Sequence, residues 1–339
     1  MKIINCRNVN DGFIKGMDLL GQHRGNLKFS RAGEVIEVPE PVATVYQNSR
    51  ERVLFEDVRK ANPFFHLMES LWMLCGANDL EYVKTYNKRM EEYSDDGITL
   101  QGAYGFRWRE HFGGDQLSVI IKRLRHDPYD RRSVLQMWDP LVDLDAHSKD
   151  VPCNTVIYFK VREGELDMTV SCRSNDCIWG TFGANIVHMS ILQEYMAYGI
   201  GVGVGTYTQV SDSFHAYEEV FNPMYEELES QDAFDFFSQF NSANPYSNKA
   251  INPYPLINTN IETWEVDLSR FMRRAPMQDV DFVDPFFYEV AVPLQDAWHL
   301  YKSGEYDEAL IEVQGCSATD WATAGYDWLN RAITNKESK

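Results

Sequence analysis

The chain has 339 residues, of which 44% are hydrophobic and 13% aromatic, enough to bury a large core in one domain or in one domain with an appendage. Its 32 basic and 51 acidic residues give a net charge of -19, which argues against a nucleic-acid polymer or an anionic membrane as partner. The charge does not exclude a single nucleotide, because a local cluster of arginines is enough to bind one.

Six cysteines are spread along the chain without a C-x-x-C pair, which indicates a reducing compartment rather than a disulfide framework. The N-terminus, MKIINCRNVNDGF, has no apolar segment of the kind found in signal peptides, and no run of about 18 apolar residues occurs. These features predict a cytoplasmic protein that is neither secreted nor membrane-spanning. Cys172 and Cys177 match no common zinc spacing, so no metal is expected.

Residues 1–60 are expected to form short strands and loops. Arg50 and Arg52 lie in a polar loop, which is either a solvated turn or a mobile phosphate clamp. Asn62 and Pro63 then predict the start of a helix that ends at Gly76. This helix is apolar nearly all round and contains Glu69. A buried carboxylate needs a function or a partner, and His66, one turn earlier, is a candidate partner.

Residues 77–112 contain Gly102, Tyr104, Gly105 and Trp108, a composition that predicts an irregular loop beside a ligand. An amphipathic helix follows from 115 and stops at Asp127 and Pro128.

Arg131 and Arg132 open the next predicted strand, SVLQMWDP. Paired arginines in this place are usually surface residues, and they are also suited to bidentate binding of a phosphate.

Residues 154–161 and 166–173 alternate polar and apolar side chains around a Glu163–Gly164 turn, which predicts a β-hairpin. A helix over 185–199 and a strand over 206–217 follow. Residues 222–283 suggest extended excursions, and 284–332 have a helical pattern. We therefore expect a catalytic domain over 1–283 and a helical extension over 284–339.

The segment from Val151 to Asn185 has the residue types needed to modify carbon 5 of a pyrimidine. That carbon becomes nucleophilic once a thiolate has added to carbon 6, so the chemistry needs a cysteine near cations. It also needs an anchored phosphate, a group that recognises the base, and a proton shuttle. Cys153, the arginines, Asn185 and Glu69 are candidates for these four roles.

The chain resembles the thymidylate synthase and pyrimidine hydroxymethylase family over about residues 45–220. The matching motifs, in family order, are HLMESLWMLCG, GAYGFRWR, the DQL helix, DRRSVLQMWDP, PCNTVIYF, RSNDCIWG and FHAY. The resemblance implies an α/β fold with a large mixed sheet covered by helices. It also implies 5,10-methylenetetrahydrofolate as one-carbon donor, a pyrimidine nucleoside monophosphate as substrate, and a homodimer that shares arginines across its interface.

The resemblance implies a role for each matching residue. Cys153 corresponds to the nucleophile, Glu69 to the glutamate that organises water and relays protons, and Tyr104 to a residue of the active-site loop. Asp176 and Trp108 are expected on the folate side. The substrate-binding positions are Arg173 and Ser174 for phosphate, Arg131 and Arg132 for the partner's phosphate, His215 and Tyr217 for the sugar, Asn185 for the base, and Arg52 or Arg50 in the mobile loop.

Three departures from thymidylate synthases bear on the product. Asn154 replaces the usual histidine after Pro-Cys, the segment after RSND differs, and the short apolar C-terminal tail is missing. RSND followed by an aromatic residue and glycine is closer to the phage deoxycytidylate hydroxymethylases, in which water completes the reaction. The sequence therefore favours 5-hydroxymethylation of dCMP. The alternatives are hydroxymethylation or methylation of dUMP, and a catalytically silent nucleotide-binding protein.

The choice of base depends on one position. An ungapped count from Arg173 places Ala184 at the base-recognising position, whereas one inserted residue places Asn185 there. A carboxamide can turn either end toward the base, so Asn185 is compatible with uracil and with cytosine.

Overall fold

The computed structural model describes the chain except for residues 32, 236–243, 249–250 and 338–339. It divides into two compact units. The first unit comprises Met1–Ala61, Leu117–Pro140 and Pro152–Lys249, and the second comprises Asn62–Gln116, Leu141–Val151 and Ala250–Lys339. The domain boundary expected at 283/284 stays a prediction.

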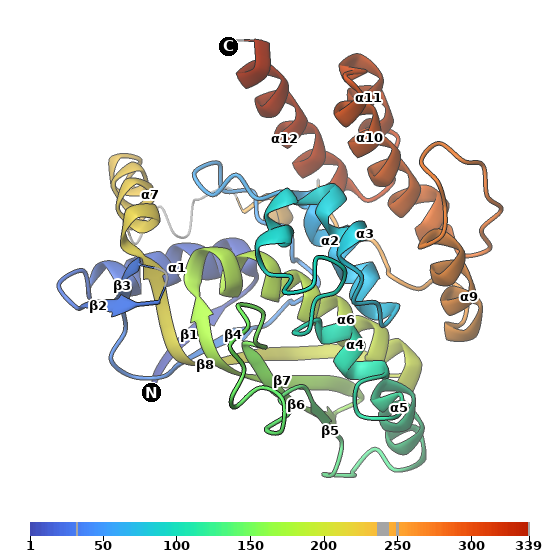
Figure 1. Cartoon of the computed structure of the whole chain (residues 1–339), viewed down its shortest axis with the longest axis horizontal. Coiled ribbons are helices and arrows are strands. Elements are labelled where there is room, and N and C mark those ends of the chain that lie inside the picture. The colour runs from blue at the N-terminus through green and yellow to red at the C-terminus, as the bar shows by residue number, and fades with distance from the viewer. Residues whose placement is uncertain (32, 236–243, 249–250, 338–339) are drawn as a thin grey trace. The chain divides into compact units, whose positions relative to one another are not determined.

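The described part of the first unit contains a mixed eight-stranded sheet with the order β1-β4-β8-β7-β6-β5, and β3 joins β2 to β8 (Figure 1). The pairs β1–β4 and β7–β8 are parallel, and the other pairs are antiparallel. The strands are β1 (Lys2–Cys6), β2 (Leu27–Ser30), β3 (Gly33–Glu37), β4 (Val42–Tyr46), β5 (Val134–Gln136), β6 (Asn154–Arg162), β7 (Glu165–Asp176) and β8 (Gly203–Tyr217). The expected α/β fold with a large mixed sheet is confirmed.

The predicted hairpin is confirmed in β6 and β7, which pair antiparallel. Glu163 and Gly164 have φ values of 51° and 82° between the strands. Positive φ at both loop residues matches the right-handed twist of the strands, and glycine adopts it without steric strain. This turn fixes the register as far as Val156 opposite Ser171, and a bulge between Asn154 and Val156 then places Asn154 opposite Cys172 at the far end of the hairpin.

One face of the sheet is buried and the other is partly exposed. Along β7 the side chains alternate between buried and half-buried from Leu166 to Cys172. Figure 1 shows α1 (Val9–Gly21) and α6 (Asn185–Ile200) over the sheet. Nearly every residue of α6 is buried, which explains why its sequence is apolar on all sides. The predicted helix over 185–199 is thus confirmed.

Two helices of the first unit were not expected. Residues 1–60 were predicted as strands and loops, yet they include α1, which begins after the N-cap Asn8. Glycine has a low helix propensity, and α1 contains Gly12, Gly16 and Gly21. A Cβ atom at Gly16 would lie 2.2 Å from the ring of Phe182, so glycine is needed for the close packing of α1 on that ring. The helix α7 (Glu218–Ser230) likewise replaces part of the expected excursion.

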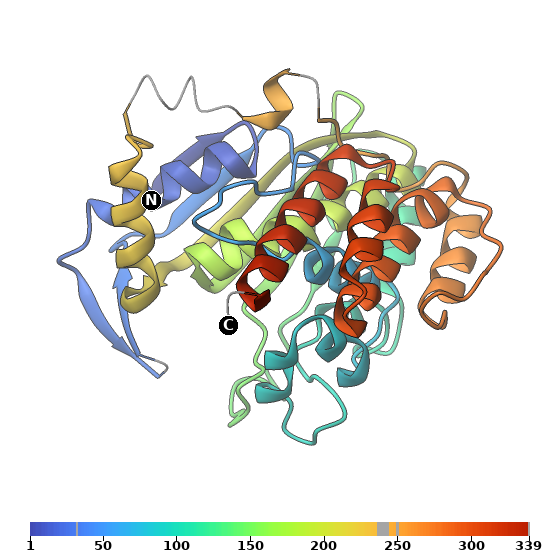
Figure 2. The ribbon, with the colours of Figure 1, turned by 90° about the horizontal axis from the view of Figure 1, so that it is seen from above.

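The second unit is mainly helical. Its described helices are α2 (Pro63–Leu74), α3 (Leu80–Tyr86), the 3₁₀ helix η1 (Lys88–Glu92), α4 (Tyr104–Arg109), α9 (Ile261–Phe271), the π-helical η4 (Phe287–Ala291), α10 (Val292–Ser303), α11 (Tyr306–Gln314) and α12 (Thr319–Glu337). The remaining helical segments are α5 (Gln116–His126), η2 (Cys177–Ala184) and η3 (Pro245–Asn248). Figure 2 shows α10, α11 and α12 side by side in red and orange. The helical pattern predicted after residue 284 is confirmed.

Helix α2 starts as predicted, with the side chain of Asn62 accepting a hydrogen bond from the main-chain N–H of Phe65. The loop predicted around Tyr104 is wrong, because residues 104–109 form α4. Gly105 allows α4 to approach α2 closely, since a Cβ atom there would lie 2.0 Å from the carbonyl oxygen of Met73. In the part of the chain that the structure describes, no helix is long and apolar enough to cross a membrane.

Candidate functional site

Cys153 and Arg173 are joined through the main chain at the start of β6 and the end of β7. The N–H of Arg173 donates to the carbonyl of Cys153 at 2.9 Å, and Nε of Arg173 donates to the carbonyl of Pro152 at 2.9 Å. The guanidinium carbon also lies 5.6 Å from the centre of the Trp138 ring. These contacts hold a cation beside the half-buried cysteine, an arrangement suited to a thiolate nucleophile.

His215 and Asp176 are paired neighbours on β8 and β7, and Ser174 pairs with Ser213 two residues away. The hydroxyl of Ser213 lies 3.1 Å from Nδ1 of His215, and the rings of His215 and Tyr217 meet edge to face with centres 6.2 Å apart. The parallel pairing of β7 with β8 therefore brings four of the expected substrate and folate positions to one end of the sheet.

Asp176 is a half-buried residue whose carboxylate has one buried oxygen. Its Oδ1 accepts a hydrogen bond of 2.6 Å from the N–H of Trp179, whereas the buried Oδ2 has no hydrogen-bond partner among the residues that the structure describes. Burial raises the pKa of Asp176, and the main-chain N–H of Trp179 and the charges of His215 and Arg59 partly offset that rise. A buried acceptor without a donor fits a ligand that carries N–H groups, such as the pterin ring of a folate.

Arg59 lies next to Asp176 and was not singled out from the sequence. Its guanidinium stacks over the Trp179 ring at 4.4 Å, and its Nε donates to the carbonyl of Ile178 at 2.8 Å. Burial lowers the pKa of Arg59 to about 10, against the opposing effect of the Asp176 charge. Trp179 itself remains 44% exposed, so an aromatic surface backed by a cation is open to a flat ligand.

The segment that precedes Asn185 is a π-helix, η2. A π-turn accommodates one residue more than an α-turn, which is compatible with the alternative of one inserted residue before Asn185. As a result Asn185 is the first residue of α6 and is buried, while Ala184 is only half-buried. The geometry favours Asn185 over Ala184 as the base-recognising residue.

Four buried carboxamides, one of which is Asn185, form one hydrogen-bonded chain, which we call the amide network. Gln209 donates to Asn154 at 2.9 Å, Asn154 donates to Asn185 at 3.0 Å, and Asn185 donates to Asn175 at 3.0 Å. Sequence reasoning noted Asn154 only as a departure and missed Gln209 and Asn175. Their signal is a polar residue at an inward-facing position of an otherwise apolar strand.

The loop with the two candidate clamp arginines is tied to α6. Both arginines contact the carboxylate of Glu194, which Arg52 bonds directly and which lies 3.1 Å from Nε of Arg50. The side chain of Arg52 is 5% exposed and that of Arg50 is 36% exposed. Arg50 is therefore the better placed of the two to reach a ligand.

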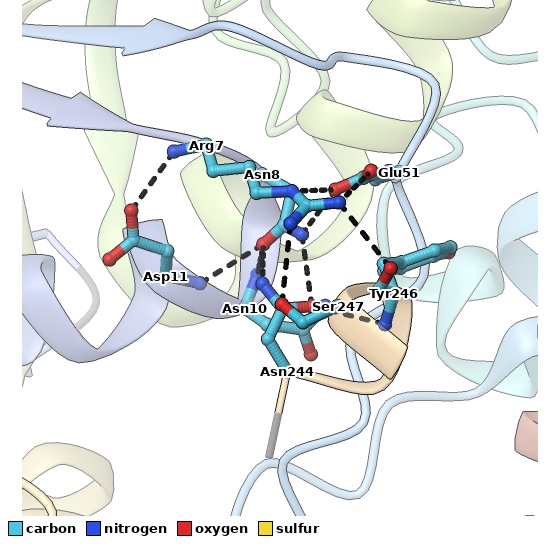
Figure 3. Close-up of polar contacts among 8 residues, drawn as sticks. All are labelled: Arg7, Asn8, Asn10, Asp11, Glu51, Asn244, Tyr246 and Ser247. Atoms are coloured by element: carbon cyan, nitrogen blue, oxygen red, sulfur yellow. Dashed lines mark hydrogen bonds and ion pairs between the residues drawn. The ribbon is translucent and has the colours of Figure 1, made fainter. Parts of the chain in front are cut away.

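A second polar cluster holds the same loop from its other side (Figure 3). Arg7 makes a two-pronged contact with Glu51 through Nε at 2.9 Å and Nη2 at 2.8 Å. Asn8 donates to Glu51 at 2.6 Å and exchanges hydrogen bonds of 3.1 Å with Asn244. Since Glu51 lies between Arg50 and Arg52, these contacts fix the main chain that carries both.

Arg131 and Arg132 are exposed in the turn between α5 and β5. Nε of Arg132 lies 2.9 Å from Asp130, and this contact lowers the pKa of Asp130 to about 2. Asp130 also pairs with Arg123, so the turn is braced from inside while the two arginines extend into solvent.

The remaining expected residues belong to the second unit. Glu69 is half-buried on α2, and its charge contributes to a raised pKa of Asp150, which is caused mainly by burial. Tyr104 begins α4, and Trp108 is fully buried, with no hydrogen-bond partner for its indole nitrogen in the described part of the chain. The buried position of Trp108 indicates a packing role in addition to any contact with a folate.

The chain was compared with known proteins. The family model for thymidylate synthase matches residues 43–260. A deoxyuridylate hydroxymethyltransferase of Pseudomonas phage M6 is 47% identical over 98% of this chain and 94% of its own length. A deoxyuridylate hydroxymethyltransferase of Bacillus phage SP01 is 38% identical over 59% of this chain and 56% of its own length. A putative thymidylate synthase of Methanothermobacter marburgensis is 38% identical over 63% of this chain and 92% of its own length.

These matches agree with the motif order, the mixed sheet and the cysteine–arginine pairing. Members of this family take the one-carbon unit for carbon 5 of a pyrimidine nucleotide from methylenetetrahydrofolate. The chain belongs to the thymidylate synthase family and is a folate-dependent one-carbon transferase.

Proposed function

We propose that the enzyme converts dUMP to 5-hydroxymethyl-dUMP. The observation that carries this proposal is the placement of Cys153 against Arg173, with the carboxamide of Asn185 in the same unit. The printed names of the phage relatives support dUMP better than dCMP, which the sequence motifs alone had favoured. They also support hydroxymethylation over methylation.

In this proposal the thiolate of Cys153 adds to carbon 6 of the uracil ring, which makes carbon 5 nucleophilic. Arg173 and Ser174 bind the phosphate, and His215 with Tyr217 binds the sugar hydroxyl. The folate, when bound, supplies the one-carbon unit, and Asp176 with the Trp179 surface holds it. Resemblance to the family assigns proton and water handling, including removal of the proton from carbon 5, to Glu69 and Tyr104. After tetrahydrofolate has left, water adds to the exocyclic methylene carbon to give the hydroxymethyl group, and the bond between Cys153 and carbon 6 breaks to release the product.

The half-exposed face of the sheet supports a homodimer. Along β8 the side chains that alternate with the buried ones, such as Val204, Thr206 and Thr208, are only half-covered within this chain. Val204 and Val210 are apolar side chains on this face, and a second copy stacked on it buries them. Arg131 and Arg132 then extend toward the partner's phosphate. The phage relatives further support a role in the cytoplasm of an infected cell.

The test is to incubate the enzyme with methylenetetrahydrofolate and either dUMP or dCMP, and to determine the mass of the nucleotide product. We expect a hydroxymethyl product from dUMP without formation of dihydrofolate. A methyl product accompanied by dihydrofolate identifies a thymidylate synthase instead, and a product from dCMP alone identifies the other base. Cys153→Ser serves as the inactive control, and sedimentation of the active enzyme tests the dimer.

A further inference from the structure

The amide network has a direction. In each of its bonds the nitrogen of one carboxamide faces the oxygen of the next, from Gln209 through Asn154 and Asn185 to Asn175. Turning one amide alone by a half-rotation puts two oxygens, or two N–H groups, against each other at about 3 Å, which is unfavourable in a buried place. The members therefore turn together or not at all.

Hydroxyl groups terminate the network at both ends. The hydroxyl of Tyr207 donates to Oε1 of Gln209, and Nδ2 of Asn175 donates to Oγ of Ser211 at 2.9 Å. A hydroxyl is able to donate or to accept. The bonds that join the four amides to one another and to these two hydroxyls can therefore all run in the opposite direction without any of them being lost.

Uracil and cytosine differ in just this respect. Uracil presents an N–H donor at N3 and an oxygen acceptor at position 4, whereas cytosine presents an acceptor at N3 and an amino donor at position 4. The amide of Asn185 has one more lone pair and one more N–H than its bonds to Asn154 and Asn175 use. Its orientation decides which of the two meets N3.

We propose that the direction of the amide network, rather than the identity of Asn185 alone, determines whether the enzyme accepts uracil or cytosine. The inference rests on the proposed function, in which Asn185 contacts the base. It makes Asn154, Gln209 and Asn175 positioning residues for specificity. The observed direction is the one that we assign to uracil.

Two chemically identical substitutions on opposite sides of Asn185 test this inference. In Asn175→Asp, the carboxylate still accepts from Nδ2 of Asn185 and now accepts from the Ser211 hydroxyl, so the observed direction is kept. In Asn154→Asp, the carboxylate still accepts from Gln209 but faces the oxygen of Asn185. That repulsion turns Asn185 and Asn175, and the Ser211 hydroxyl adapts by donating.

The measurement is the ratio of kcat/KM for dUMP to that for dCMP, together with the ratio of the two dissociation constants without folate. We expect Asn154→Asp to lower both ratios by about 100-fold, because two hydrogen bonds to uracil become mismatched. We expect Asn175→Asp to leave both ratios within about threefold of the wild type. A charge effect or a general loss of packing acts on both bases alike and cancels in the ratio.

An equal response of the two variants overturns the inference, as does a ratio that changes only in Asn175→Asp. If Asn154→Asp does not fold, Gln209→Glu replaces it, because a carboxylate there faces the oxygen of Asn154 and reverses the network from one residue farther away. A failure of the proposed function is seen separately in the wild-type enzyme. If wild type prefers dCMP, the assigned base is wrong, and reversal of the network must then shift the ratio toward dUMP.

Discussion

The main-chain N–H of Arg173 lies 2.9 Å from the carbonyl oxygen of Cys153, so the two residues occupy fixed positions on adjacent strands. The Nε bond of Arg173 to Pro152 adds a second restraint at 2.9 Å. In the proposed reaction the same guanidinium binds the phosphate and lies beside the nucleophile. Substrate binding and thiolate reactivity are thus coupled through one side chain.

Replacement of Arg173 by lysine is expected to raise KM for dUMP by about tenfold or more, because lysine keeps the charge but loses the planar fork and the Nε bond. Arg173→Met, which also removes the charge, is expected to slow alkylation of Cys153 by iodoacetamide beyond the effect of Arg173→Lys. Arg162→Lys is the matched control, since Arg162 is exposed and pairs with Asp167 elsewhere on the hairpin. Equal alkylation rates for wild type and Arg173→Met contradict the coupling.

Substitutions of Arg50 and Arg52, the two arginines that contact Glu194, are expected to have different effects on stability and on nucleotide binding. Arg52→Met leaves a buried carboxylate short of a cation, and we expect it to lower the free energy of unfolding by about 3 kcal/mol. Arg50→Met is expected to cost about 1 kcal/mol or less, because Arg50 is partly exposed, but to raise KM for the nucleotide.

Urea unfolding and steady-state kinetics on the same samples distinguish the two effects. The double variant Arg52→Met with Glu194→Met removes both charges and is expected to recover much of the lost stability. If Arg52→Met instead raises KM and leaves stability unchanged, Arg52 is the phosphate clamp.

The parts of the fold that depend on local sequence patterns could be predicted from the sequence. Alternation along 154–173 and the Glu163–Gly164 turn predicted the hairpin, and Asn62 with Pro63 predicted the start of α2. The helix α1 was not predicted, and its glycines are explained by rings that are distant in the sequence: Phe182 for Gly12 and Gly16, and Tyr225 for Gly21. Tertiary contact, not local propensity, selects glycine there.

The candidate site shows the same division. The cysteine and the arginines were assigned from ordered motifs, since each has a distinctive neighbour in the sequence, and their roles stay predictions. The amide network was not found, because Gln209, Asn154 and Asn175 come from three strands and meet only through pairing. The sequence left open whether an insertion precedes Asn185, because the π-helical turn there has no local signal.

Gly16→Ala is expected to destabilise the protein although alanine favours helix. Helix propensity gains about 1 kcal/mol, whereas a methyl group 2.2 Å from the Phe182 ring forces a repacking that costs about 1–3 kcal/mol. Gly25→Ala is the matched control, because no atom lies within 4 Å of the added Cβ. Thermal unfolding of both variants is the measurement. An increase in melting temperature for Gly16→Ala means that Phe182 has room to move.

Asp176→Asn is expected to stabilise the folded enzyme at neutral pH while weakening its binding of folate. The folded state raises the pKa of Asp176 above its ordinary value of about 4, so the native protein holds this proton more tightly than the unfolded chain does. The free energy of unfolding of the wild type therefore decreases as the pH rises from the ordinary pKa through the raised pKa. Asp176→Asn does not show this decrease. Folate affinity decreases because an amide offers the pterin N–H groups a weaker acceptor than a carboxylate.

Urea unfolding of the wild type and of Asp176→Asn between pH 4 and pH 8 measures the first effect, and titration with tetrahydrofolate measures the second. The difference in unfolding free energy between the two proteins should grow as the pH rises and then level off above the raised pKa. Asp130→Asn is expected to lower the free energy of unfolding at neutral pH. Arg132 lowers the pKa of Asp130 to about 2, so the ionised Asp130 stabilises the fold at that pH. Equal gains in unfolding free energy for Asp176→Asn and Asp130→Asn contradict the proposal that burial of the Asp176 charge destabilises the fold. Asp130 is held in a salt bridge, so its loss is not expected to stabilise the protein.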